Sequence, residues 1–224
     1  MASSVDTPVT APEHRSEDQP KALAWISRNQ KLVSYGGLAL AVVVVGGWLL
    51  LETAQRKELA GADALDRARA TFESGNLPTA SSEFQRVAQS YRGTAAGYAA
   101  ELALNEVRLA SGQTQIAVDE LKKFAESNPP AFFASGAWNM VGAGLENLKK
   151  YPEAAQAYRQ SAGLAEESYR KVEATLSAAR ALRLAGQDSQ AIELLRGILA
   201  KFGKEIPGVA EAEVRLAEVT RGVL

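Results

Sequence analysis

Cysteine is absent from this chain of 224 residues, and histidine occurs only once. Without cysteine the protein has no disulfide bond, thiolate nucleophile, cysteine-based zinc site or iron–sulfur cluster, and no cysteine that could carry a lipid anchor. The single histidine, His14, lies among Pro, Glu, Ser and Asp near the N-terminus. A Ser-His-Asp triad or a multi-histidine metal centre is therefore not expected, because such a segment does not hold an imidazole in fixed geometry.

An excess of charge of either sign is also lacking. The chain has 25 Lys and Arg against 26 Asp and Glu, and hydrophobic residues make up 46%. These values exclude a disordered polyelectrolyte and a strongly basic nucleic-acid-binding protein. Adjacent carboxylates such as Asp119 and Glu120 point in different directions on a helix, so they do not form a catalytic pair. We predict that the protein is not an enzyme, that it has no catalytic residues and no cofactor, and that it binds no metal or nucleic acid.

A third absence is local, because residues 32–51 (LVSYGGLALAVVVVGGWLLL) contain no charged side chain. Twenty residues in a helix reach about 30 Å, the thickness of the hydrocarbon core of a bilayer. Aromatic and basic residues flank or end the run, as expected at a membrane interface. The flanking residues are Trp25, Lys31, Tyr35 and Trp48. The run is too long and too far from the N-terminus for a cleaved signal peptide, and too uniformly apolar for a core helix, so it predicts a retained, single-pass transmembrane helix.

The segments before this run have a different composition. Residues 1–20 are rich in Ser, Pro, Thr, Asp and Glu, which predicts a flexible tail. Residues 21–31 suit either a short interfacial segment or the first turns of the spanning helix. Slightly more basic residues lie before the run than just after it, which favours an N-terminus in the cytoplasm. We therefore place the protein in the bacterial cytoplasmic (inner) membrane with its C-terminal domain in the periplasm.

Residues 52–224 contain a repeat with a period of 37 residues, counted between Ala80, Ala117, Ala154 and Ala191. A large apolar residue follows each alanine by four positions, and these residues are Phe84, Leu121, Tyr158 and Leu195. A turn residue, glycine in three repeats and Lys149 in the other, lies five positions before each alanine. Small residues let antiparallel helices approach, large ones fill the groove between them, and glycine ends the first helix of each pair. These residues, together with Trp138, are the predicted core of a series of helical hairpins.

The fold class expected from this pattern is all-α, with one transmembrane helix followed by an α-solenoid of about four helical hairpins. A single hairpin cannot bury its apolar face, so the hairpins must stack. The predicted pairs are 56–74 with 78–91, 94–111 with 114–127, 131–148 with 152–164, and 167–185 with 188–202. The segment 207–222 is a single helix without a partner and is the predicted C-terminal capping helix.

The repeats resemble the tetratricopeptide repeat. The third repeat shows the W-x2-L-G-x2-Y line of that family most fully, with Trp138, Val141, Gly142 and Leu145, followed by Ala154 and Tyr158. In the second repeat Pro129 occupies the closing proline position, whereas Asn105 replaces the small residue of the first helix. The period of 37 instead of the usual 34 implies slightly longer helices or loops.

The whole plan also resembles a narrower family, the bacterial ancillary translocon subunit with a tetratricopeptide-like domain. The resemblance lies in Trp25, Asn29 and Lys31 before the apolar run and in Gly47 and Trp48 near its end. Membership would imply a chaperone-linked role at the protein-export channel.

Two sets of residues are candidates for binding a partner. By repeat position, the inner helices offer polar side chains that would line the concave face of a solenoid. The candidate groove residues are Arg69, Glu106, Asn139, Asn147, Arg180 and Arg183. Arg180 and Arg183 share one helix face, and each of the six also fits a plain solvated surface. Phe132 and Phe133 form either an exposed apolar contact or a hydrophobic staple that closes a loop.

These observations predict a membrane-anchored, non-enzymatic scaffold or accessory subunit. Its partners would be membrane-embedded and extracytoplasmic protein subunits of a larger complex, together with the lipid bilayer. The complex would be the protein-export channel or a respiratory or photosynthetic assembly. The alternative is a periplasmic, chaperone-like module that binds exported peptides transiently.

Overall fold

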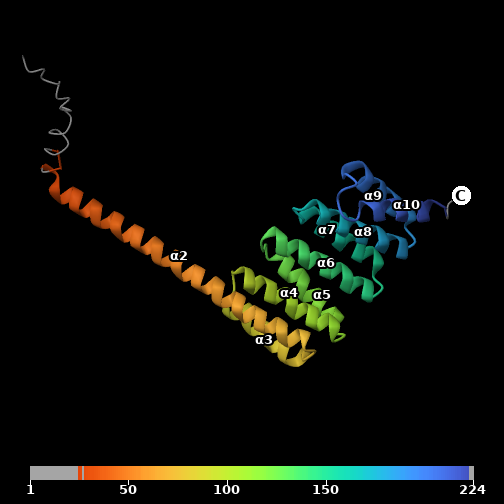
Figure 1. Ribbon diagram of the computed structural model, residues 1–224, viewed down its shortest axis with the longest axis horizontal. Helices are drawn as coiled ribbons and strands as arrows, with labels where there is room; N and C mark the ends of the chain where they lie inside the picture. Colours follow the sequence, from red (N-terminus) through yellow and green to blue (C-terminus); the bar gives the residue numbers. More distant parts are fainter. Residues whose placement is uncertain (1–24, 27, 222–224) are drawn as a thin grey trace, which may run out of the picture. The chain divides into compact units, whose positions relative to one another are not determined.

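The described part of the chain is built from helices alone. A computed structural model of the protein describes residues 25–26 and 28–221, and none of these residues lies in a β-strand. The helices are α2 (Gln30–Glu73), α3 (Leu77–Ser90), α4 (Ala95–Ala110), α5 (Thr114–Glu126), α6 (Ala131–Asn147), α7 (Tyr151–Leu164), α8 (Ser168–Leu184), α9 (Asp188–Lys201) and α10 (Val209–Arg221) (Figure 1). The predicted all-α class is confirmed. The predicted tail, residues 1–20, and His14 lie outside the described residues.

Contacts along the backbone divide the chain into two compact units, Met1–Ala54 and Gln55–Leu224. The part of α2 in the first unit is long and apolar enough to cross a membrane, and a signal sequence near an N-terminus would satisfy the same criteria. None of its apolar stretch is buried. Trp25, Tyr35 and Trp48 are 62%, 72% and 61% exposed, and Lys31 is exposed as well. The side chains of all four predicted interfacial residues are therefore exposed on the surface of this helix.

The sequence predicts separate helices over 32–51 and 56–74, whereas α2 is a single helix over Gln30–Glu73. The intervening residues 52–60 (ETAQRKELA) contain no glycine or proline, and most of them have high helix propensity. No local signal ends the helix there, because both proline and a glycine at a helix end are missing. The apolar run and the first helix of the repeats therefore belong to the same helix.

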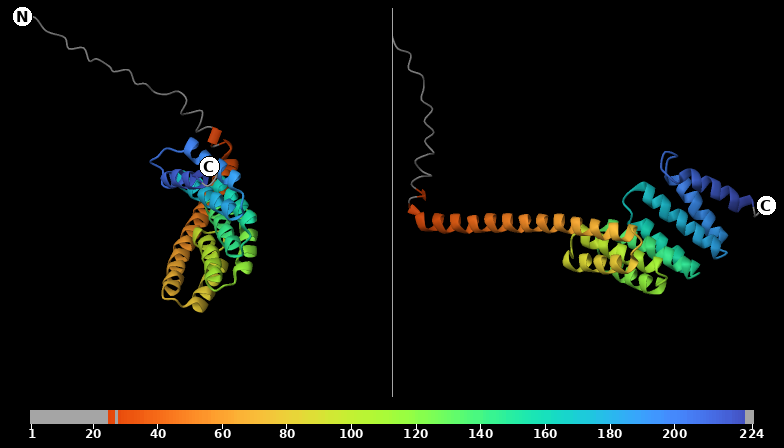
Figure 2. Two further views of the ribbon diagram at one scale, coloured as in Figure 1. Left: turned by 90° about the vertical axis from the view of Figure 1, so that its right-hand side faces the viewer. Right: turned by 60° about the horizontal axis from the view of Figure 1, so that its bottom comes forward.

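The second unit is a stack of helical hairpins (Figure 2). The C-terminal part of α2 packs on α3, where Phe72 meets Phe84. Helix α4 pairs with α5, α6 with α7, and α8 with α9, while α10 packs on α9 and ends the array. Apart from the start of α2, the observed helix ends lie within two residues of the predicted ends. The capping helix begins at Val209 instead of residue 207 because Gly208 has a φ of +89°, which is not helical. The predicted solenoid of four hairpins and a capping helix is confirmed.

The turn inside each hairpin has the same backbone conformation in all four repeats. Gly75, Gly112 and Gly186 have φ values of +82°, +76° and +73°, and Lys149 at the equivalent position has +59°. Glycine adopts this left-handed conformation without steric cost, whereas for other residues it costs about 1–2 kcal/mol. The repeat therefore imposes the turn even where its sequence lacks the glycine.

The predicted core positions are buried. The four alanines are 0% exposed and the four large residues that follow them are at most 2% exposed, while Trp138 is half-buried at the edge of the core. The buried side chains form two clusters, one from α2, α3 and α4 and one from α5 to α10. The boundary between the clusters falls inside the second hairpin. At this place Asn105, 1% exposed, occupies the position that Gly142 has in the third hairpin, since 142 − 105 = 37.

Candidate functional site

The candidate groove residues come from the first helices of the hairpins. Arg69, Glu106 and Arg180 occupy one repeat position, because 106 − 69 = 37 and 180 − 106 = 74, and all three are exposed. Arg69 pairs with Asp66 one turn earlier on its own helix, at 3.3 Å. Such an exposed pair contributes little to stability, about 0.3–0.5 kcal/mol. The structure therefore leaves Arg69 and Glu106 on a solvated face.

Arg180 belongs to a cluster with Glu146 and Tyr158, which we call the Glu146 cluster. The Arg180 guanidinium donates two hydrogen bonds to the Glu146 carboxylate, from Nη2 to Oε2 at 2.9 Å and from Nε to Oε1 at 3.3 Å. The Tyr158 hydroxyl donates to the same Oε2 at 3.2 Å. Only 17% of the Glu146 side chain is exposed. The cluster joins α6, α7 and α8, so it holds two successive hairpins together by charge-assisted hydrogen bonds.

The surroundings of the Glu146 cluster shift two pKa values upward. Burial raises the pKa of the Tyr158 hydroxyl to about 12, and the negative charge of Glu146 acts in the same direction. The hydrogen bond to Glu146 raises the pKa of the Arg180 guanidinium above its usual value. At neutral pH Tyr158 is therefore a neutral donor and Arg180 a cation, which are the charge states that Glu146 requires.

The raised pKa of Tyr158 predicts a loss of stability in alkali. Its ordinary pKa of about 10 applies to the unfolded chain, which then releases the proton before the folded chain does. The free energy of unfolding should therefore fall as the pH rises from about 10 to about 12. The Tyr158→Phe variant should be less stable than the natural chain by about 1 kcal/mol at pH 7 and should lose less stability over that pH range.

Urea unfolding in detergent solution at several pH values measures this effect. The matched control is Tyr169→Phe, because the Tyr169 side chain is 48% exposed. Parallel pH profiles for the natural chain and Tyr158→Phe would contradict the prediction.

Arg183 is held by a different partner from Arg180. Its Nη1 lies 3.8 Å from Glu218 Oε2 on the capping helix α10. Glu146 and Arg183 occupy equivalent repeat positions, since 183 − 146 = 37. Glu146 contacts α8, the first helix of the next hairpin, and Arg183 contacts the capping helix α10. The two arginines that share one helix face thus serve two successive contacts between repeats.

The other two groove candidates lie apart from this pair. Asn147 is exposed at the end of α6. Asn139 is half-buried and lines a cavity of about 240 Å³, whose other lining residues are Ser135, Gly136, Met140, Ser161, Arg170 and Glu173. Inside it, Ser135 Oγ donates to the Ser161 carbonyl oxygen at 3.0 Å. A larger cavity of about 690 Å³ lies between α7, α8 and α9, away from all six groove candidates.

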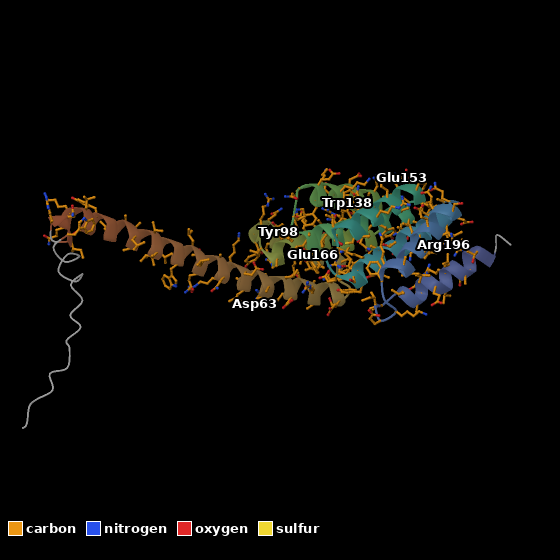
Figure 3. All side chains as sticks on the ribbon, turned by 90° about the horizontal axis from the view of Figure 1, so that it is seen from above. Asp63, Tyr98, Trp138, Glu153, Glu166 and Arg196 are labelled. Carbon is orange, nitrogen blue, oxygen red and sulfur yellow. The ribbon has the colours of Figure 1, made fainter. Side chains whose placement is uncertain are left out.

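The apolar candidates Phe132 and Phe133 point to different surroundings. Phe133 is half-buried and lies 5.3 Å from the ring of Tyr98 on α4, whereas Phe132 is 52% exposed. The Arg170 guanidinium carbon lies 4.2 Å from the centre of the Phe132 ring, a cation–π contact. Figure 3 shows Tyr98 on α4 and Trp138 on α6 among the side chains of the repeats. One phenylalanine therefore packs between hairpins and the other faces outward.

The residue that the sequence analysis missed is Glu146, the centre of the Glu146 cluster. A usable signal was present, because Arg180 carries the opposite charge 34 residues after Glu146, and Glu218 likewise lies 35 residues after Arg183. A charge at a repeat position that faces the neighbouring hairpin predicts a partner of opposite sign there. The spacing of Arg180 and Arg183 by itself indicates only that they share one helix face.

The stacked helical hairpins define a class of protein, the helical-repeat interaction scaffold. Among the described residues, no group of three or more His, Asp and Glu side chains could hold a metal ion. The model of the family described as "Tetratricopeptide repeat-like domain" matches residues 47–181, more than half of the chain. The chain belongs to this tetratricopeptide repeat-like family, whose stacked hairpins are typically protein-interaction modules without enzymatic activity.

Two solved structures share the fold. A crystal structure of nearly identical TPR-like repeats from Podosopora anserina is 19% identical, with a TM-score of 0.56, and the alignment covers 71% of this chain and 85% of that chain. The crystal structure of MamA is 17% identical, with a TM-score of 0.54 and coverage of 69% and 83%. The comparison with curated proteins found no match. These results identify the domain family, while the ancillary translocon family stays a prediction.

Proposed function

We propose that the protein is a membrane-anchored scaffold or accessory subunit that binds and stabilises partner proteins of a larger membrane complex. The observation that carries the proposal is the combination of an uncharged 20-residue run, residues 32–51, with a tetratricopeptide-like domain in one chain. The run supplies the attachment and the stacked hairpins supply the protein-binding surface. The protein-export channel and a respiratory or photosynthetic assembly are both compatible with this design.

The pairing of the inner-face arginines supports a scaffold over a transient peptide-binding chaperone. A groove that accepts many clients needs free donors for peptide carboxylates and carbonyl groups. Arg180 is instead engaged by two hydrogen bonds to Glu146, whose side chain is 17% exposed. Arg183 lies 3.8 Å from Glu218 in an exposed pair that contributes little to stability. The engagement of Arg180 between two repeats suits a fixed binding platform.

Membrane extraction followed by native sizing tests the proposal. The full chain should remain in the membrane pellet after alkaline carbonate treatment and should migrate, after gentle detergent extraction, in a complex larger than one chain. Protease added to spheroplasts should digest the repeat domain, which is placed in the periplasm. Release by carbonate would refute the anchor, a lone monomer would refute the scaffold, and digestion only after lysis would reverse the orientation.

A further inference from the structure

A continuous row of side chains follows one edge of the repeat domain. Tyr98, Phe133, Phe132 and Arg170 come from the first turns of α4, α6 and α8. The ring centres of Tyr98 and Phe133 are 5.3 Å apart, those of Phe133 and Phe132 are also 5.3 Å apart, and the Arg170 guanidinium carbon lies 4.2 Å from the Phe132 centre. We call this set the aromatic row. The aromatic row follows the N-terminal ends of α4, α6 and α8, the first helices of three successive hairpins. The loops that connect one hairpin to the next lie at the same edge of the domain.

The outward-facing rings on this edge recur with the period of the repeat. Phe132 and Tyr169 are 37 residues apart and are 52% and 48% exposed. Leu164, at the end of α7 on the same edge, is 39% exposed. The two large rings occupy equivalent positions, and each is left about half exposed by the described part of the chain.

The second unit of the chain begins at this same edge. Lys57 Nζ donates to the Arg92 carbonyl oxygen at 3.0 Å, and Glu58 Oε1 accepts from the Ala95 amide nitrogen at 2.9 Å. Residues 57 and 58 are thereby fastened to the turn that starts α4, the helix of Tyr98. The edge with the aromatic row is therefore the edge by which the chain enters the domain.

The length of chain between the uncharged run and this edge is short. Lys57 follows Leu51, the last residue of the run, by six residues. Six residues span about 9 Å in a helix and about 20 Å when fully extended. The headgroup layer on each side of a bilayer is about 5–8 Å thick. For any orientation of the two units, this tether keeps the turn before α4 close to the membrane surface.

We propose that the edge with the aromatic row lies in the headgroup layer of the bilayer, with the Phe132 and Tyr169 rings inserted at its boundary. The inference rests on the proposed membrane anchor. Aromatic rings favour this layer, where a ring can lose contact with water. Arg170 takes no part in the contact with lipid, because only 19% of its side chain is exposed and it pairs with Glu167 and stacks on Phe132. Glu166 and Glu167 in the same turn oppose strong binding to anionic lipid, so a mainly zwitterionic surface fits this edge best.

Single-cysteine labelling tests the proposal cleanly, because the chain has no cysteine of its own. Ala131→Cys and Ser168→Cys, again 37 residues apart, place a fluorophore beside Phe132 and Tyr169 and leave both rings intact. The full chain is reconstituted in phosphatidylcholine nanodiscs that contain a lipid with a nitroxide on its headgroup. Both fluorophores should be quenched. Ser189→Cys, on the opposite edge at the start of α9, should remain bright.

Two further variants separate the possible outcomes. A fluorophore at Ala41→Cys, inside the uncharged run, reports the anchor through quenching by a nitroxide on the acyl chain. Quenching at position 41 without quenching at 131 and 168 would overturn the proposal and leave the anchor intact, whereas no quenching at 41 would refute the anchor. In the Phe132→Ser, Tyr169→Ser background, quenching at 131 and 168 should fall to the level at 189; unchanged quenching would show that the rings do not hold the edge. Protection from an aqueous quencher without lipid quenching would assign the edge to a protein partner instead.

Discussion

Replacement of Phe84 by alanine should destabilise the domain by about 3–5 kcal/mol, the cost typical of emptying a buried phenylalanine site. Phe84 is 1% exposed, and its ring meets that of Phe72 edge to face with centres 6.3 Å apart. It lies in the cluster formed by α2, α3 and α4. In a stack of repeats each hairpin contacts only its neighbours, so the damage should concentrate in this part of the domain.

Hydrogen exchange of the full chain in detergent, followed by mass spectrometry, measures where the stability is lost. Protection should fall strongly in α3 and α4 and much less in α6 to α9. The matched control is Ile116→Ala, since Ile116 is 53% exposed and its truncation should change stability by only about 0.5 kcal/mol. An equal loss of protection in every helix would show that the domain unfolds as one cooperative unit.

Replacement of Gly142 by alanine should also destabilise the domain, by about 1–3 kcal/mol, because it overpacks the core. A Cβ atom at this position would lie 2.6 Å from Cε1 and 2.7 Å from Cδ1 of Tyr158. That ring is buried, and its hydroxyl is held by Glu146 at 3.2 Å, so it cannot move aside freely. The backbone of α6 at Gly142 therefore lies directly against the Tyr158 ring of α7.

The same substitution at Gly197, inside α9, should have the opposite sign. An added Cβ there would meet nothing within 4 Å, and alanine favours the helix over glycine by about 0.5–1 kcal/mol. Thermal unfolding of Gly142→Ala and Gly197→Ala, side by side in the same detergent, tests both signs. A stabilised Gly142→Ala variant would mean that the Tyr158 ring adapts and that the close approach is not required.

The repeat period was sufficient to predict the hairpins, because each turn, small residue and large residue acts locally. Gly75, Gly112 and Gly186 mark helix ends in any context, and the alanines report the distance between paired helices. The period also located the turn at Lys149, although its residue type did not indicate one. The single helix α2 was missed because the prediction placed a boundary where apolarity ends, and a change in polarity does not break a helix.

The partners of Arg180 and Arg183 could not be predicted from single positions in the sequence. Arg180 and Arg183 do share one face of α8, as their spacing indicates, but each bonds to a helix from a different neighbouring repeat. These contacts depend on how far successive hairpins rotate in the stack, and that rotation results from the packing of many side chains. The shared helix face of Arg180 and Arg183 could therefore be predicted from the sequence. Their partners, Glu146 and Glu218, could not, because they depend on the rotation between successive hairpins.

Because the core is divided inside the second hairpin, we expect the solenoid to bend more easily there than elsewhere in its described part. The buried side chains of α4 and α5 belong to separate clusters. The buried Asn105, at the position where α6 has Gly142, hydrogen-bonds within its own helix, to the Glu101 carbonyl oxygen and to Arg108. The contacts across this boundary include Tyr98, whose ring lies 6.1 Å from that of Phe124 and 5.3 Å from that of Phe133. Tyr98 therefore links the aromatic row to the boundary between the two clusters. Binding of the row to a membrane surface should then change the angle between α2–α4 and α5–α10.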